Sequence, residues 1–237
     1  MIKGKLYMIP TTLGECDVDK IIPLYVKEHL HNLKVFIVEN SKTARAFLKK
    51  MNIPTPQNEL KIYVLNKHTP IEEIHSFLNA CRNGTDIGII SEAGCPSVAD
   101  PGAEITNIAH KEDIQVVPLV GPSSILLALM ASGMNGQSFT FNGYLPIEKF
   151  ERKKKLQNLE KNSRNYNQTQ IFIETPYRND KLIDSIYQSL QGNTKLCIAC
   201  DLSLNSEYIK TKTVHEWKKV SKPQLNKRPC IFLIHAR

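Results

Sequence analysis

The chain has 237 residues, of which 41% are hydrophobic and 23% charged, and its net charge is +8. This composition is ordinary for a globular protein and excludes an intrinsically disordered one. No stretch approaches the ~20 apolar residues of a transmembrane helix, and the N-terminal segment MIKGKLYMIP lacks the apolar core of a signal peptide. We therefore expect a cytoplasmic protein with no membrane-spanning segment.

The first half of the chain alternates short apolar runs with helical patterns. In chain order we expect a strand over 5–10, a helix over 17–30, a strand over 35–38, a helix opening at Ser41, a strand over 62–65, a helix from 70, a strand over 87–91, a helix from about 100 and a strand over 114–118. Thr69 and Glu72 are spaced as a capping box, with Pro70 at the first helical position. Such alternation predicts a mostly parallel sheet with helices on both faces.

The second half predicts a mixed, more antiparallel sheet. Its expected elements are a hydrophobic helix through Met130, a strand over 139–142, a basic helix from about Glu148, a strand over 170–174, a helix over 177–190 and strands over 195–201, 207–214 and 230–235. A glycine-proline turn follows the last strand of the first half. We place the boundary there and expect two domains, 1–118 and 119–237.

The excess of positive over negative charge is confined to the second half. Residues 1–143 carry 13 Lys and Arg against 14 Asp and Glu, whereas residues 144–237 carry 18 against 9. This asymmetry favours a polyanionic partner such as RNA, although a basic surface that aids solubility explains it about as well.

The six cysteines lie mostly in apolar or helical stretches, as reduced core cysteines do. Cys197 and Cys200 form a CxxC, but no second CxxC or histidine pair is near. We expect a packing role for them, no disulfide and no metal site.

The segment from Ser91 to Gly102 carries the strongest functional signal. An apolar strand runs into a loop with two glycines, two prolines and two carboxylates ahead of a helix. In parallel α/β sheets such loops line the ligand crevice. Asp100 can cap the next helix, with Pro101 at its first position, but capping does not account for Ser91–Pro96. The segment from Val117 to Ser124 is similar in kind, and alone it reads equally well as a linker.

Together with Gly4–Gly14, Ser132–Pro146 and Ile171–Arg178, these segments resemble the tetrapyrrole methylases, the class III S-adenosylmethionine-dependent methyltransferases. Within that superfamily, the order of the motifs resembles the branch that methylates a ribose 2′-oxygen in small-subunit ribosomal RNA. The resemblance covers essentially the whole chain. It also fits the absence of the GxGxxG fingerprint.

The resemblance implies two α/β domains with a cofactor cleft between them, a homodimer, S-adenosylmethionine as cofactor and a role in ribosomal RNA processing. The cofactor contacts that it implies are Pro10, Glu92, Ala93, Gly94, Cys95, Pro122, Ser123, Ser124, Leu145, Thr175, Ala199, Cys200 and Asp201. The chain departs from the family pattern at Glu39–Lys42, at Glu92 and Cys95, at Cys200-Asp201 and at Lys227–Pro229.

A ribose hydroxyl is a poor nucleophile and benefits from a general base. Glu39, Glu174, Asp201 and Glu207 are candidates, and Glu39 is favoured because it matches the acidic position after the family's second strand. Candidate RNA contacts are Lys149, Arg152, Lys153, Lys154, Lys155 and Arg178. Two alternatives stay open: a methylase of a tetrapyrrole or other small molecule, and a degenerate module that binds cofactor or RNA without catalysis.

Overall fold

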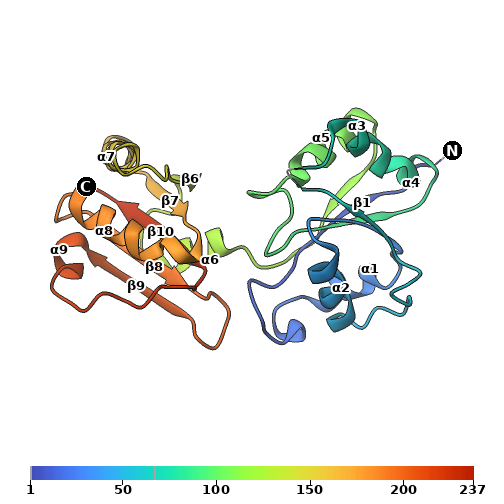
Figure 1. Ribbon diagram of the computed structural model, residues 1–237, viewed down its shortest axis with the longest axis horizontal. Coiled ribbons are helices and arrows are strands. Elements are labelled where there is room, and N and C mark those ends of the chain that lie inside the picture. Colours follow the sequence, from blue (N-terminus) through green and yellow to red (C-terminus); the bar gives the residue numbers. More distant parts are fainter. Residues whose placement is uncertain (1, 67) are drawn as a thin grey trace. The chain divides into compact units, whose positions relative to one another are not determined.

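The computed structural model describes residues 2–66 and 68–237, which form two compact units, Met1–Ser123 and Ser124–Arg237 (Figure 1). The boundary expected from sequence, after Pro118, lies at the end of the last strand of the first unit and five residues before the division between the two units. Each unit has its own sheet and its own hydrophobic core. Among the described residues, no helix is long and apolar enough to cross a membrane.

The first unit is built on a five-stranded sheet in the order β3-β2-β4-β1-β5, in which every pair is parallel. Its strands are β1 (Leu6–Ile9), β2 (Val35–Val38), β3 (Lys61–Val64), β4 (Ile87–Ile90) and β5 (Val116–Pro118). Strands β1, β2 and β4 are buried at every position, as their unbroken apolar runs require. The predicted parallel sheet is confirmed.

Helices cover both faces of this sheet. They are η1 (Val18–Lys20), α1 (Leu24–Leu30), α2 (Ser41–Lys50), α3 (Ile71–Ile74), η2 (His75–Leu78), α4 (Asn79–Arg82) and α5 (Gly102–Lys111). Helices α1 and α2 pack on Tyr7 and Ile9 of β1, whereas the segment from α3 to α5 packs on Leu6 and Met8. Successive strand residues point to opposite faces, so one apolar strand supplies both cores.

Two local expectations in the first unit were wrong. The helix expected over 17–30 is interrupted, because Pro23 cannot donate a helical hydrogen bond and instead stands as the N-cap of α1. Thr69 does not cap the helix at 71, since Pro70 is its N-cap. The Thr69 hydroxyl instead accepts from the Asn66 amide at 2.9 Å and donates to the Val64 carbonyl at 3.2 Å.

The second unit holds the expected mixed sheet, and its strand order is β6-β7-β10-β8-β9. Its elements are α6 (Ser124–Ser132), β6 (Phe139–Tyr144), α7 (Lys149–Tyr166), β7 (Thr169–Ile173), η3 (Pro176–Arg178), α8 (Asn179–Ser189), β8 (Lys195–Cys200), β9 (Tyr208–Thr213), α9 (Val214–Trp217) and β10 (Cys230–His235). Strands β6 and β7 are parallel, and the other pairs are antiparallel. Helices α7, α8 and α9 pack on one face around Trp217 and Phe172, and α6 lies against β9 and β10.

The cysteine prediction needs one correction. Cys200 and Cys230 face each other on β8 and β10 with their Cα atoms 4.2 Å apart, and they form a disulfide. Cys197 is buried and free. Cys197 and Cys200 are three positions apart on a strand and therefore point to opposite faces. The CxxC spacing thus could not predict the disulfide between Cys200 and Cys230 on neighbouring strands. In the described part of the chain, no group of three or more His, Cys, Asp or Glu side chains could hold a metal ion.

Candidate active site

The first unit gathers its candidate residues at one edge of the sheet. Since all five strands are parallel, the segments that follow β1, β2, β4 and β5 leave the sheet at the same edge. Pro10, Glu39, the loop from Ser91 and the loop to Ser123 therefore lie together. This edge is where open parallel α/β sheets bind their ligands.

The loops after β1, β4 and β5 are fastened to one another. The Thr11 amide donates to the Gly94 carbonyl at 2.9 Å. Gly94 is buried with φ +73°, and a Cβ there would lie 3.2 Å from Leu13 Cδ2 and 3.3 Å from the Pro122 oxygen. The backbone path thus requires glycine. The Cys95 thiol points to the Pro122 carbonyl at 3.4 Å, and burial raises its pKa, so it serves as a protonated donor rather than a nucleophile.

Asp100 shapes the far end of the β4 loop. Its carboxylate accepts from the Ser97 amide at 2.9 and 3.0 Å and from the Gly102 amide at 2.7 Å. Asp100 was expected at the N-cap, with Pro101 at the first helical position. In the structure Pro101 is the N-cap and helix α5 begins at Gly102, so Asp100 lies one residue before the N-cap and still accepts from the first amide of the helix. Ser97 and Ala99 both have positive φ, at 66° and 65°. The hydrogen bonds from the Ser97 amide to both Asp100 oxygens stabilise this strained backbone.

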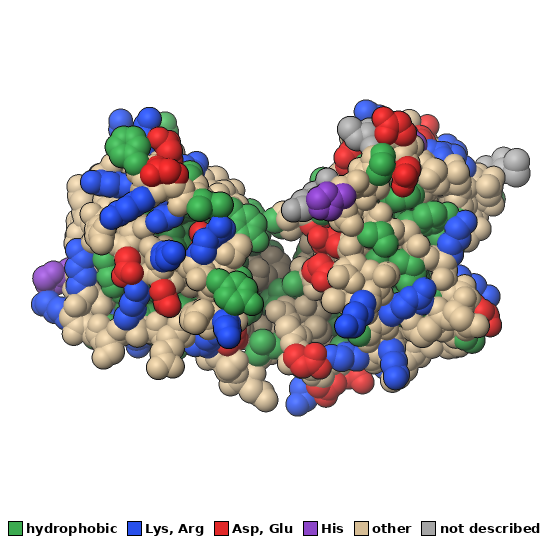
Figure 2. Space-filling view, viewed as in Figure 1, with side chains coloured by type: hydrophobic (Ala, Val, Ile, Leu, Met, Phe, Trp, Pro, Cys, Tyr) green, Lys and Arg blue, Asp and Glu red, His purple; other side chains and the backbone are tan. Residues whose placement is uncertain are grey.

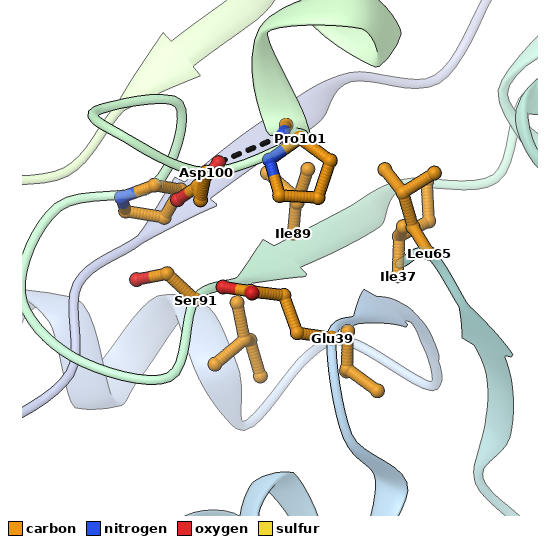
Figure 3. A pocket seen from close by; sticks show the side chains of 11 residues that line it. Ile37, Glu39, Leu65, Ile89, Ser91, Asp100 and Pro101 are labelled. Carbon is orange, nitrogen blue, oxygen red and sulfur yellow. Dashed lines mark hydrogen bonds between the residues drawn. The ribbon is translucent and has the colours of Figure 1, made fainter. Parts of the chain in front are cut away.

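Glu39 stands at the end of β2 and lines a small pocket with Ser91, Pro96 and Asp100 (Figure 3). Its carboxylate is directed toward Ser91, and Oε1 accepts from the Glu92 amide at 3.2 Å. Burial raises the Glu39 pKa; the bond from the Glu92 amide opposes this, and the Asp100 and Glu92 carboxylates raise it further. A carboxylate with a raised pKa is a stronger base than an ordinary one.

Each of the other candidate bases accepts hydrogen bonds at one of its carboxylate oxygens. Glu174 is buried, and its Oε1 accepts from the Thr175 amide at 2.6 Å and from Arg178 at 2.6 and 2.9 Å. Asp201 is buried and accepts from Arg228 Nε and from a serine hydroxyl, both at 2.8 Å. Glu207 is exposed and accepts from the Ser203 amide at 2.7 Å. Glu174 and Asp201 are thus paired with arginines, whereas Glu39 has no ion pair among the described residues.

The second unit collects candidate cofactor residues at one edge of its own sheet. Strand β10 is antiparallel to both β7 and β8, so β6, β7 and β8 run in the same direction. Leu145, Thr175 and Asp201, which follow these three strands, therefore lie at a common edge. Leu145 is almost fully buried in the core and Thr175 is half-buried.

Ala199 and Cys200 fit the role of cofactor contacts poorly. Both side chains are fully buried, and both residues pair with β9 and with β10. Cys200 is also held in the disulfide. They present no accessible side chain to a ligand, so we retain Asp201 alone of the three.

The candidate RNA contacts divide into two groups. Lys149, Lys153 and Lys154 are exposed on α7 and Lys155 is half-buried. Arg152 is 8% exposed, and it donates to the Ser185 hydroxyl at 2.9 Å and to the Ile147 carbonyl at 2.7 Å. Arg152 is almost fully buried and anchors the helix through Nε and Nη1, so we leave it out of the proposed surface.

Arg178 is also occupied, through its ion pair with Glu174, although its side chain stays 31% exposed. Lysine and arginine side chains are spread widely over the unit that carries α7, α8 and α9 (Figure 2). The net charge of +9 carried by residues 144–237 therefore appears as an exposed basic surface, since most of those lysines are exposed.

Three contributors were not identified from sequence. The Thr43 hydroxyl donates to Glu92 Oε1 at 2.6 Å, and Arg228 pairs with Asp201. Asp100 was read as a helix cap, yet it also raises the Glu39 pKa. The residues of each hydrogen-bonded pair, Thr43 with Glu92 and Asp201 with Arg228, are 27 or more positions apart in the chain. These contacts therefore depend on the order of the strands in the sheet. The one feature of the sequence that could have drawn attention to Arg228 is the departure from the family pattern at Lys227–Pro229.

Known proteins share both the fold and the sequence pattern. The family of Tetrapyrrole (Corrin/Porphyrin) Methylases matches residues 13–217. Among solved structures, the methyltransferase CobJ superposes with a TM-score of 0.64 at 13% identity, covering 98% of this chain and 94% of CobJ. Cobalt precorrin-4 methyltransferase CbiF gives 0.63 at 16%, with the same coverage.

Curated relatives are more similar in sequence. Ribosomal RNA small subunit methyltransferase I of Vibrio cholerae is 30% identical over 204 residues, covering 86% of this chain and 67% of that protein. The Pseudomonas aeruginosa protein of the same name is 27% identical, covering 99% of this chain and 79% of its own length.

The family match, together with the parallel and mixed sheets that this chain shares with the solved structures, identifies a methyltransferase of a family that uses S-adenosylmethionine as methyl donor. The chain belongs to the tetrapyrrole methylase family.

Proposed function

We propose that this methyltransferase transfers a methyl group to a ribose 2′-oxygen of small-subunit ribosomal RNA. One observation carries the choice of acceptor: relatives named for methylation of small-subunit ribosomal RNA align at 26–30% identity, several of them over nearly the whole chain. The net charge of +9 in the second unit supports a polyanionic acceptor. The proposal includes a homodimer, as the resemblance implies, and a cytoplasmic location.

The residues of the first unit fit a cofactor site. Gly94 has a left-handed backbone and no side chain, while Glu92 and Ala93 beside it are exposed. Pro10, Glu92–Cys95, Pro122 and Ser123 are retained as candidate contacts there. In the second unit the candidates are Ser124, Leu145, Thr175 and Asp201. When bound, S-adenosylmethionine supplies an activated methyl group on its sulfonium.

Glu39 is the proposed general base. A 2′-hydroxyl placed within hydrogen-bond reach of its carboxylate would pass its proton to Glu39 as the oxygen attacks. The raised pKa of Glu39 improves this transfer, and the Glu92 amide fixes the orientation of the carboxylate. The rest of the catalytic advantage comes from holding the acceptor and donor in line.

The test is transfer of a labelled methyl group to unmodified small ribosomal subunits, with a porphyrinogen as the competing acceptor. We expect label in the ribosomal RNA, in a dinucleotide that resists alkaline hydrolysis, because a 2′-O-methyl group removes the nucleophile of that cleavage. Label on a base would refute the ribose assignment. Label in the porphyrinogen alone would favour a tetrapyrrole methylase, and no transfer despite cofactor binding would favour a degenerate binding module.

A further inference from the structure

A groove in the second unit lies between the first turns of α7 and the second half of α8. Phe150, Lys149 and Lys153 line it from α7, and Gln188 and Ser189 line it from α8. We call it the α7–α8 groove. None of the cofactor candidates is among the residues that line it.

Phe150 gives the groove an aromatic surface in contact with solvent. Its side chain is 69% exposed, and Ile147, just before α7, is 67% exposed. A single exposed apolar side chain is unremarkable in a folded protein. Here, however, the ring stands next to one lysine and three positions before another in the lining of the same groove.

The charge of the groove is positive. Lys149 and Lys153 are one helical turn apart, and within the described chain neither has an ion-pair partner. The acidic residue in the lining is Glu148, whose carboxylate accepts from the Glu151 amide at 2.8 Å. Bonds from the Glu151 and Phe150 amides lower the Glu148 pKa. Glu148 is therefore committed to capping α7, and the two lysines are left unpaired.

We propose that the α7–α8 groove binds an unpaired nucleotide of the RNA substrate. The base stacks on Phe150, and Lys149 and Lys153 neutralise the flanking phosphates. Gln188 and Ser189 supply polar groups for the base edge. An aromatic face can be used only by a base that is not stacked in a helix, which selects single-stranded RNA over duplex. The inference rests on the proposed RNA acceptor, and it adds a substrate subsite outside the cofactor candidates.

The experiment compares the affinity of the full-length protein for a single-stranded RNA oligonucleotide and for the same sequence in a duplex. Phe150→Ala should weaken single-strand binding about fivefold or more, because stacking of one base on an aromatic ring contributes at that level. Duplex binding should change less than twofold. Tyr166→Ala is the matched control, since Tyr166 is 68% exposed in the last turn of the same helix and does not line the groove.

The lysines are tested through salt dependence. Lys153→Gln should reduce the slope of log affinity against log salt by about 0.7, the value for one phosphate contact on a single strand. Lys161→Gln, an exposed lysine of α7 outside the groove, should leave the slope unchanged. Equal losses for Phe150→Ala and Tyr166→Ala would overturn the proposal, as would tighter binding of an acidic polypeptide than of RNA.

Failure of this inference can be separated from failure of the proposed function. If the native protein methylates ribosomal RNA and Phe150→Ala binds the oligonucleotide normally, the groove is not a nucleotide site and the function stands. If the native protein neither binds RNA nor methylates it, both proposals fall.

Discussion

At the scale of single residues, the candidate chemistry centres on Glu39. The β2 strand ends at Val38, which places Glu39 at the ligand edge, and the Glu92 amide holds its carboxylate there. The environment that raises its pKa combines burial with two carboxylates from the neighbouring loop. A surface carboxylate would have neither feature.

Glu39→Gln should lower the rate of methyl transfer about 10²- to 10⁴-fold, the usual contribution of general base catalysis. The affinity for S-adenosylhomocysteine should stay within about twofold. Glu104→Gln, an exposed carboxylate of α5, is the control and should retain native activity. An unchanged rate for Glu39→Gln would remove Glu39 from the mechanism.

The pH profile gives a second test of Glu39. The base must be ionised to accept a proton, so activity should fall as pH decreases through its pKa. Because that pKa is raised above 4.5, the fall should begin at a higher pH than for an ordinary glutamate. In Glu39→Gln this acidic limb should disappear from the residual activity.

At the scale of elements, α7 combines two kinds of basic residue that the sequence did not distinguish. Arg152 is buried and fixes the start of the helix to α8 and to the Ile147 carbonyl, whereas Lys153 and Lys154 beside it are exposed. In this run of basic residues, Arg152 has a structural role and the exposed lysines do not. The difference follows from helical geometry, since residue 152 falls on the side that carries Leu156 and Leu159.

Arg152→Ala should destabilise the second unit by about 1.5–3 kcal/mol, because charge-assisted hydrogen bonds to buried partners are lost. Lys154→Ala should change stability by less than about 0.5 kcal/mol, as exposed substitutions do. Fluorescence during denaturant unfolding can follow both variants, since the sole tryptophan, Trp217, is buried in the core of this unit. Similar midpoints for the two variants would show that Arg152 does not anchor α7.

At the scale of the whole molecule, the two halves of the chain differ in net charge, and the basic second half is expected to supply most of the electrostatic attraction for RNA. The first unit is nearly neutral and the second carries the basic surface. S-adenosylhomocysteine, the product of the donor, has no net charge at neutral pH. Its binding should therefore involve little release of counterions, whereas RNA binding should involve several.

Calorimetric titration of the full-length protein with S-adenosylhomocysteine should show about one site per chain. Raising salt from 50 to 200 mM should change that affinity less than about twofold. The same change should weaken RNA binding about tenfold if two or three phosphates are neutralised. Saturation at a salt-sensitive site, or no binding by the folded protein, would contradict the assignment of the cofactor residues.

Much of this protein was readable from its sequence. Unbroken apolar runs such as Val35–Val38 specify strands that are buried on both faces. Because helices alternate with these strands, a parallel sheet covered by helices on both faces is the arrangement that buries them. The resemblance located the loops after β1 and β4. Glu39 was favoured from its place in the pattern, and it now stands in the pocket beside Asp100.

Other features depended on the tertiary structure, because they join residues that are distant in sequence. The Cys200–Cys230 disulfide, the Asp201–Arg228 pair and the Glu92–Thr43 bond each require strand order and register. The burial of Arg152 and the exposure of Phe150 are set by which side of α7 meets α8. Local sequence fixes periodicity and capping, whereas packing in three dimensions decides which polar groups are paired and which remain free to bind.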